Sequence, residues 1–198
     1  VSPFACNIYF SLGWSFKNGL DFLTGLSAAV AVLMLKGLQK AGVSGLQLKW
    51  PNDILFNDKK LVGILIDASG ESSGDCQVII GVGINVDMGT EAYPIDQAWT
   101  DIVSIIGKPV SRNTLLSLLL TELLVGLDRF KHERLKAFQS HWQQHDMLYG
   151  KEVEIQSQGG SYCGVARGID AYGALWIETP AGRQRLYHAD ITVRPRSR

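Results

Sequence analysis

Residues 46–86 read LQLKWPNDILFNDKKLVGILIDASGESSGDCQVIIGVGINV and hold three apolar runs joined by short polar connections. The run over Leu46–Phe56 is interrupted by a Pro-Asn-Asp turn, so it is extended rather than helical. The runs over Leu61–Ala68 and Gln77–Val86 are apolar enough to form strands that are largely buried. Because the connections between these runs are too short for crossover helices, the pattern predicts antiparallel hairpins.

On either side of this stretch the pattern changes with position along the chain. Residues 7–16 alternate and are rich in aromatic side chains, which predicts another strand. Helical periodicity dominates over residues 20–41, 95–106, 113–130 and 133–145, and short strand-like pieces with glycine-rich turns follow Leu148. The sequence therefore predicts an α+β protein. A mixed or antiparallel sheet flanked by helices is expected in residues 1–146, and a small β-barrel-like domain in residues 147–198.

The composition limits the classes of function. Of the 198 residues, 46% are hydrophobic, and Lys+Arg balance Asp+Glu at 19 each, so the chain has no electrostatic basis for non-specific binding to nucleic acid. The apolar segment 20–38 contains Asp21 and Lys36, so we expect a buried helix rather than a membrane span. Three widely spaced cysteines form no metal-binding or disulfide pattern, which favours a reducing compartment, the cytoplasm.

The densest polar cluster in apolar surroundings is KWPND, residues 49–53. Its lysine could neutralise phosphate charge, and its carboxylate and amide offer oxygen ligands for Mg²⁺. Pro, Asn and Asp are also ordinary turn residues, so a simple turn explains the same composition. Lys59 and Lys60, at the entrance to the next strand, could likewise reach a bound anion or belong to a solvated turn.

Gly81 and Gly83 lie inside a very apolar strand. Glycine weakens the interior of a strand, so a ligand or a tightly packed backbone is expected to approach closely here. No third glycine has the required offset and no helix follows directly, so these residues are not a dinucleotide-binding fingerprint.

Taken in order, KWPND (49–53), KLVGIL (60–65) and IIGVGINV (79–86) resemble the signature of the biotin protein ligases, closest to the bifunctional bacterial type that also represses biotin synthesis genes. The likeness continues with RGID (167–170) and GAL (173–175), so it covers essentially the whole chain. It implies a class II synthetase-like ligase domain followed by an SH3-like barrel. It also implies two reaction steps. The biotin carboxylate attacks the α-phosphate of ATP to give biotinyl-5′-adenylate and pyrophosphate, and a lysine of a biotin carboxyl carrier protein then attacks the adenylate.

The resemblance assigns roles to single residues of this sequence. Lys60 matches the lysine that meets the biotin carboxylate and the phosphate, Lys49 matches one that neutralises phosphate charge, and Asp53 completes the expected catalytic set. Asp53 and Asn85 are the expected Mg²⁺ ligands. The positions expected to contact biotin or nucleotide are Lys60, Asn52, Gly63, Leu65, Gly81, Gly83, Ile84, Asn85 and Arg194.

The resemblance also implies segments that precede this sequence. In the family, a glycine- and arginine-rich loop that closes over biotin and phosphate lies just upstream of the strand with which this chain starts, and the bifunctional type has a DNA-binding domain further upstream. We therefore expect an N-terminally truncated part of a longer protein, inactive alone without that loop, contacting DNA only through the missing domain. No membrane partner is expected, and a homodimer is expected by analogy. Two other functions stay open: a lipoate–protein ligase, although KWPND and GVGIN favour biotin, and a non-catalytic biotin-sensing or carrier-docking module.

Overall fold

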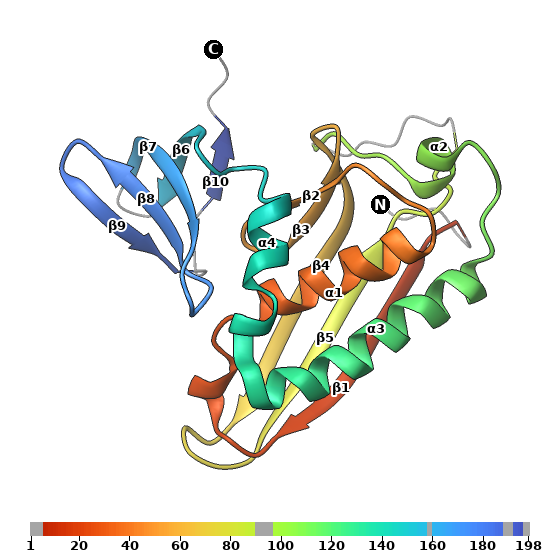
Figure 1. Ribbon diagram of the computed structural model, residues 1–198, viewed down its shortest axis with the longest axis horizontal. Helices are drawn as coiled ribbons and strands as arrows, with labels where there is room; N and C mark the ends of the chain where they lie inside the picture. The colour runs from red at the N-terminus through yellow and green to blue at the C-terminus, as the bar shows by residue number, and fades with distance from the viewer. Residues whose placement is uncertain (1–5, 90–96, 158–159, 188–191, 196–198) are drawn as a thin grey trace.

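The computed structural model describes residues 6–89, 97–157, 160–187 and 192–195, and contains two antiparallel sheets, the first of which carries helices (Figure 1). The order of strands in the first sheet is β1-β5-β4-β3-β2. These strands are β1 (Ile8–Phe16), β2 (Leu46–Lys49), β3 (Asp53–Phe56), β4 (Lys59–Gly70) and β5 (Cys76–Ile84). Every neighbouring pair is antiparallel, so the predicted hairpins are confirmed.

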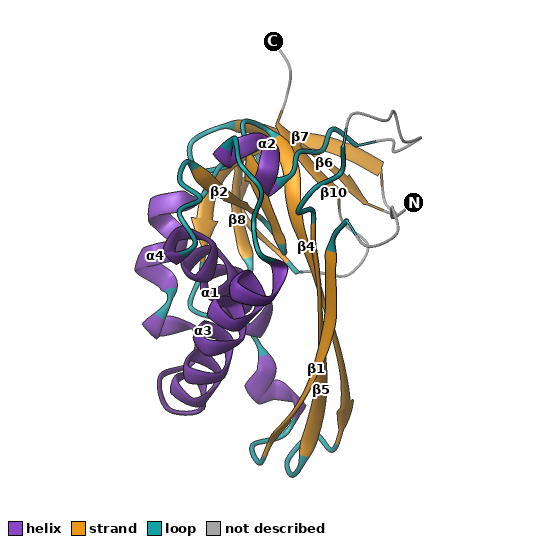
Figure 2. Cartoon of the chain, turned by 90° about the vertical axis from the view of Figure 1, so that its right-hand side faces the viewer, coloured by secondary structure: helices purple, strands orange, loops and turns teal. Residues whose placement is uncertain are grey.

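The two faces of this sheet differ because side chains alternate along each strand. On β5, Val78, Ile80, Val82 and Ile84 are buried, whereas Ile79 is exposed. The helices α1 (Leu26–Lys40) and α3 (Arg112–Glu133) cover the buried face, and no helix of the described residues lies on the opposite face (Figure 2). The sheet therefore has one face for the core and one open to ligands.

Helices α1 and α3 interlock through two glycines. Gly37 of α1 lies against Leu119 of α3, where an added Cβ would come within 3.1 Å of the Leu119 Cα. In the reverse direction, Gly126 of α3 receives the side chain of Leu33 from α1. The stretch Leu20–Lys40 is long and apolar enough to cross a membrane, but α1 is buried against the sheet and α3, as expected of a core helix.

The helix boundaries differ from the predicted ones in three places. The helix expected over residues 20–41 is a 3₁₀ turn (Leu20–Leu23) followed by α1, because Gly25 has φ 84° and separates the two. Of the helix expected over residues 95–106, only α2 (Ile102–Ile106) forms, residues 97–101 are not helical, and residues 95 and 96 lie outside the described residues. The helix expected over residues 133–145 is a 3₁₀ turn (Arg134–Ala137) followed by α4 (Gln139–His145).

The second sheet has the strand order β10-β6-β7-β8-β9. These strands are β6 (Glu152–Ser157), β7 (Gly160–Ile169), β8 (Leu175–Thr179), β9 (Gly182–Leu186) and β10 (Thr192–Pro195). The α+β class is thus confirmed, although within the described ranges no pairing joins β9 to β10. The indole of Trp50 donates a 3.0 Å hydrogen bond to the carbonyl of Gly173, which ties the KWPND turn to this sheet. The division after residue 146 stays a prediction.

Candidate functional site

One row of residues crosses the helix-free face of the first sheet. The cross-strand pairs Tyr9–Gly83, Gly83–Gly63, Gly63–Asp53 and Asp53–Lys49 place one residue from each of the five strands in register. Directly paired residues point to the same face of a sheet. The KWPND turn and both glycine-containing strands, which are far apart in sequence, therefore contribute to a single surface.

Lys60 is a cation of this surface. Its Nζ lies 2.7 Å from Oδ1 of Asp53, and the side chains of Lys60 and Asp53 are 34% and 17% exposed. The backbone of Lys60 is fixed by residues 98–100, since its N–H donates to the Ala98 carbonyl (2.9 Å) and its carbonyl accepts from Thr100 N–H (3.0 Å). The side-chain ammonium of Lys60 is thus held by the carboxylate of Asp53, and the backbone of Lys60 is held by residues 98–100.

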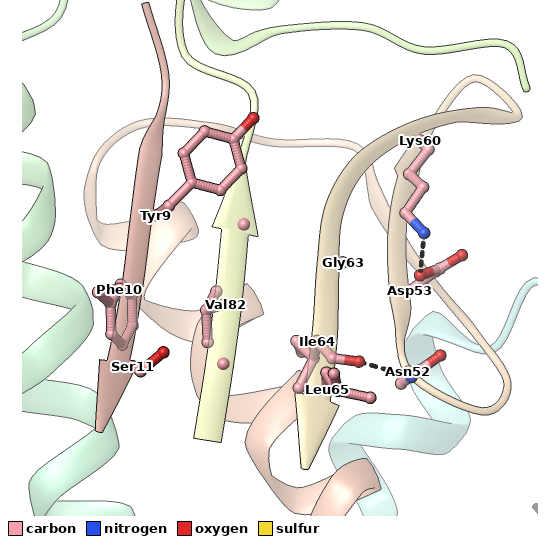
Figure 3. A pocket seen from close by; sticks show the side chains of 12 residues that line it. Tyr9, Phe10, Ser11, Asn52, Asp53, Lys60, Gly63, Ile64, Leu65 and Val82 are labelled. Atoms are coloured by element: carbon pink, nitrogen blue, oxygen red, sulfur yellow. Dashed lines mark hydrogen bonds and ion pairs between the residues drawn. The ribbon is translucent and has the colours of Figure 1, made fainter. Parts of the chain in front are cut away.

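Two cavities open on this face. The larger has a volume of about 610 Å³, and its lining residues are Tyr9, Phe10, Ser11, Asn52, Asp53, Lys60, Gly63, Ile64, Leu65, Gly81, Val82 and Gly83 (Figure 3). The smaller has about 230 Å³ and is lined by Tyr9, Lys60, Leu61, Gly63, Gly83, Asn85, Gln97 and Trp99. Four residues belong to both, so the two cavities adjoin. The larger volume is that of an ordinary small-molecule site.

Two glycines on the floor between the cavities lie in close contact with a neighbouring side chain. A Cβ on Gly63 would lie 3.1 Å from Cε of Lys60, and one on Gly83 would lie 3.1 Å from Cε1 of Tyr9. Each glycine therefore lets a neighbouring side chain lie flat over the sheet. At Gly81 an added Cβ would meet nothing closer than 3.6 Å, so its side of the larger cavity is open space.

The two asparagines are positioned by backbone groups. The side-chain Nδ2 of Asn52 donates to the backbone carbonyl of Ile64, and the backbone carbonyl of Asn52 accepts from Ile64 N–H. These two bonds dock the KWPND turn on β4. The Asn85 Nδ2 donates to the carbonyls of Lys60 (3.3 Å) and Thr100 (3.0 Å). Since Nδ2 of Asn85 is engaged in this way, Oδ1 is the side-chain atom of Asn85 left for a ligand.

Of the remaining expected site residues whose side chains the structure describes, only one lines a cavity. Leu65 is exposed and lines the larger cavity. Lys49 lies beside Asp53 in the row but lines neither cavity, and the side chain of Ile84 is buried in the core, where only its backbone faces the neighbouring strands. The backbone of Arg194 is in β10, but its side chain lies outside the described residues.

The prediction from sequence missed the contributions of β1 and of residues 97–99. Tyr9 and Ser11 reach the larger cavity because they alternate with buried Ile8 and half-buried Phe10. The alternation was visible in the sequence, but its register against β5 was not. Trp99 lines the smaller cavity from a segment that was expected to be helical.

The site offers few ligands for a metal ion. Within the described part of the chain, no group of three or more His, Cys, Asp or Glu side chains could hold one, and Asp53 is the one carboxylate among the lining residues. Mg²⁺ in nucleotide sites is commonly bound through one or two carboxylates plus phosphate oxygens and waters. Asp53 lines the larger cavity and Asn85 the smaller one, so each offers an oxygen to a metal of that kind, and the two do not make a metal site by protein alone.

Comparison with known proteins identifies two families in the chain. Residues 1–85 match the biotin/lipoate A/B protein ligase family, and residues 148–194 match the biotin protein ligase C-terminal domain. The bifunctional ligase/repressor BirA of Escherichia coli K12 is 35% identical over 178 residues, covering 89% of this chain and 55% of the relative. The biotin–[acetyl-CoA-carboxylase] ligase of Paracoccus denitrificans is 29% identical, covering 83% and 70%. The chain thus spans somewhat more than half the length of the BirA relative.

The fold agrees with these matches. The crystal structure of the biotin protein ligase from Aquifex aeolicus superposes with a TM-score of 0.82 at 25% identity, covering 96% of this chain and 83% of that one. The same Aquifex enzyme in complex with biotin and ATP superposes with a TM-score of 0.80 at 26% identity.

Proposed function

This chain belongs to the biotin protein ligase family, and we propose that its site activates biotin with ATP to biotinyl-5′-adenylate and passes the biotinyl group to a lysine of a carrier protein. One observation supports this above the others. Among the described residues, Lys60 is the one cation that lines both cavities, and it lies at their junction, held by Asp53 above a glycine floor. An enzyme that joins two anionic substrates needs a cation where they meet.

The chemistry requires no nucleophile from the protein. A carboxylate oxygen of biotin forms a bond to the α-phosphorus of ATP while the bond to pyrophosphate breaks, and a carrier lysine amine later displaces AMP. The task of the site is to align the reactants and to stabilise developing negative charge. We assign both tasks at the junction to the Lys60 ammonium, with Asp53 fixing its direction.

The two cavities suit two substrates of different character. Leu65 provides apolar surface in the larger cavity, where we place the ring and chain of biotin. Trp99 lines the smaller cavity, where an indole can stack on a nucleobase. Mg²⁺, when bound with ATP, would neutralise phosphate charge, and Asp53 and Asn85 would hold it. The complex of the Aquifex relative with biotin and ATP supports this choice of substrates.

The partners and the compartment follow from the same proposal. The proposed carrier is a protein with an accessible lysine; the name of the Paracoccus relative gives acetyl-CoA carboxylase as the protein on which that enzyme acts. A second copy of the chain is a further proposed partner. Cys76 and Cys163 form no disulfide in the described part of the chain, which supports a reducing compartment such as the cytoplasm.

A pyrophosphate exchange assay tests the proposal. The full-length protein that contains this chain is purified and incubated with ATP, Mg²⁺ and labelled pyrophosphate. Incorporation of label into ATP is compared with biotin, with lipoate and with neither acid. Exchange that requires biotin supports the proposal. Exchange that requires lipoate would make the chain a lipoate ligase, a possibility that the first matched family includes. Biotin binding in a calorimeter without any exchange would identify a sensing module instead.

A further inference from the structure

Four residues are shared by the two cavities and form what we call the neck: Tyr9, Lys60, Gly63 and Gly83. Gly63 and Gly83 are directly paired across β4 and β5 and make its floor. The Lys60 side chain lies over Gly63, and the Tyr9 ring lies over Gly83. Figure 3 shows Tyr9 and Lys60 on opposite sides with Gly63 between them. The neck therefore has a charged wall and an aromatic wall.

The aromatic wall, the side chain of Tyr9, is held in place although it is in contact with solvent. Tyr9 is 59% exposed, yet its hydroxyl accepts a 3.1 Å hydrogen bond from Nδ2 of Asn7. Asn7 is only 9% exposed, and its Oδ1 accepts from the N–H of Val86 at 3.0 Å. Since Asn7 is anchored to the backbone beyond the end of β5, it fixes the Tyr9 ring over Gly83 rather than leaving it free to rotate into solvent.

We infer that Tyr9 is a specificity-determining residue that sets the length of the carboxylic acid accepted by this site. The inference rests on the proposed function. If Lys60 binds the substrate carboxylate at the neck, the rest of the substrate extends into the larger cavity. The Tyr9 ring then limits how far the carboxylate can move through the neck toward the smaller cavity. An acid with one more methylene must either push its carboxylate past Lys60 or displace the ring.

The test compares biotin with its homologue that has one additional methylene in the side chain, each in the pyrophosphate exchange assay. The ratio of kcat/KM for biotin to that for the homologue is expected to be about tenfold or more in the unsubstituted protein, as one methylene allows. In Tyr9→Ala this ratio should fall at least threefold. The fall should come from a higher KM for biotin and from a kcat/KM for the homologue that rises relative to that for biotin. Tyr9→Phe, which keeps the ring, should retain the ratio.

A matched control and a second variant keep the test decisive. Tyr149→Ala removes a tyrosine of similar exposure, 61%, that lines neither cavity, and should leave the ratio unchanged. If Tyr9→Ala does not fold, as judged by circular dichroism, Tyr9→Leu replaces it and is interpreted in the same way. An unsubstituted ratio below threefold, or a fall below threefold in the variant, overturns the inference alone. Absence of biotin-dependent exchange in the unsubstituted protein overturns the proposed function, and the inference with it.

Discussion

Nζ of Lys60 lies 2.7 Å from Oδ1 of Asp53, and both side chains remain partly open to solvent on the helix-free face of the sheet. Ion pairs with access to water contribute little to folding, about 0–1 kcal/mol. The buried core, by contrast, lies on the other face, between the sheet and helices α1 and α3. This pair can therefore be altered with little effect on the fold, which separates effects on ligand binding from effects on stability.

In the full-length protein, Lys60→Ala is expected to abolish most biotin-dependent pyrophosphate exchange while the melting temperature changes little. Loss of a hydrogen bond to a charged group costs about 1.5–3 kcal/mol, so the rate should fall by at least about tenfold for each anion that Lys60 contacts. Lys59→Ala is the matched control, because Lys59 is the adjacent lysine on β4, is exposed and lines neither cavity. Near-normal exchange by folded Lys60→Ala protein would refute the role assigned to this lysine.

Gly83→Val is expected to weaken biotin binding more than it weakens the fold. A β-branched residue suits a strand, but its Cβ would lie 3.1 Å from Cε1 of Tyr9 and its methyl groups would fill the neck. Calorimetry should show biotin affinity reduced by about tenfold or more, equivalent to about 1.4 kcal/mol, while the unfolding free energy changes by about 1 kcal/mol or less.

Gly13→Val provides the control for that substitution. Gly13 lies on β1, points to the same face of the sheet, and an added Cβ there would meet nothing within 4 Å. The control should bind biotin like the unsubstituted protein. If Gly83→Val also binds normally, Gly83 serves only the packing of the strand, the alternative that its sequence context left open.

The strands of the first sheet were predictable because their apolar runs are bounded by turn residues and joined by short connections. The start of α2 was not predictable, because tertiary contacts determine it. Residues 98–100 pair with Lys60 instead of entering α2, which begins only where Oδ1 of Asp101 accepts from the N–H of Ser104. Helical periodicity in a sequence does not show that a distant strand will pair with the segment and keep it out of the helix.

The glycines and the tyrosine of the site show the same limit. The sequence indicated that Gly81 and Gly83 allow a close approach, but not which group approaches. At Gly83 that group is the ring of Tyr9, a residue of β1 that is 74 positions earlier and lies opposite it in register. Likewise, the partners of Asn85 are backbone carbonyls of Lys60 and Thr100, which only the folded chain brings together.

Asp146 is expected to make the free energy of unfolding fall as the pH rises above the ordinary pKa of an aspartate side chain. Burial raises the pKa of the Asp146 carboxyl above the ordinary value of 3.8, against hydrogen bonds from Leu148 N–H and the Trp142 indole that lower it. The folded state then binds a proton more tightly than the unfolded state, so deprotonation just above pH 3.8 favours unfolding. Denaturant unfolding from about pH 4 upward should show a decline that Asp146→Asn lacks. Parallel curves for the two proteins would contradict this.

Gly126→Ala is expected to destabilise the contact between α3 and α1, and the sign of its effect should reverse when Leu33 is shortened. The new Cβ would overlap Cδ1 and Cδ2 of Leu33. Such overpacking costs about 1–3 kcal/mol and outweighs the gain of about 1 kcal/mol in helix propensity. In a Leu33→Ala background the clash is absent, so only the propensity gain remains and Gly126→Ala should stabilise that protein. The measurement is the unfolding free energy of the unsubstituted protein, the two single variants and the double variant. If Gly126→Ala changes stability with the same sign in both backgrounds, Leu33 is not the reason that glycine is favoured at position 126.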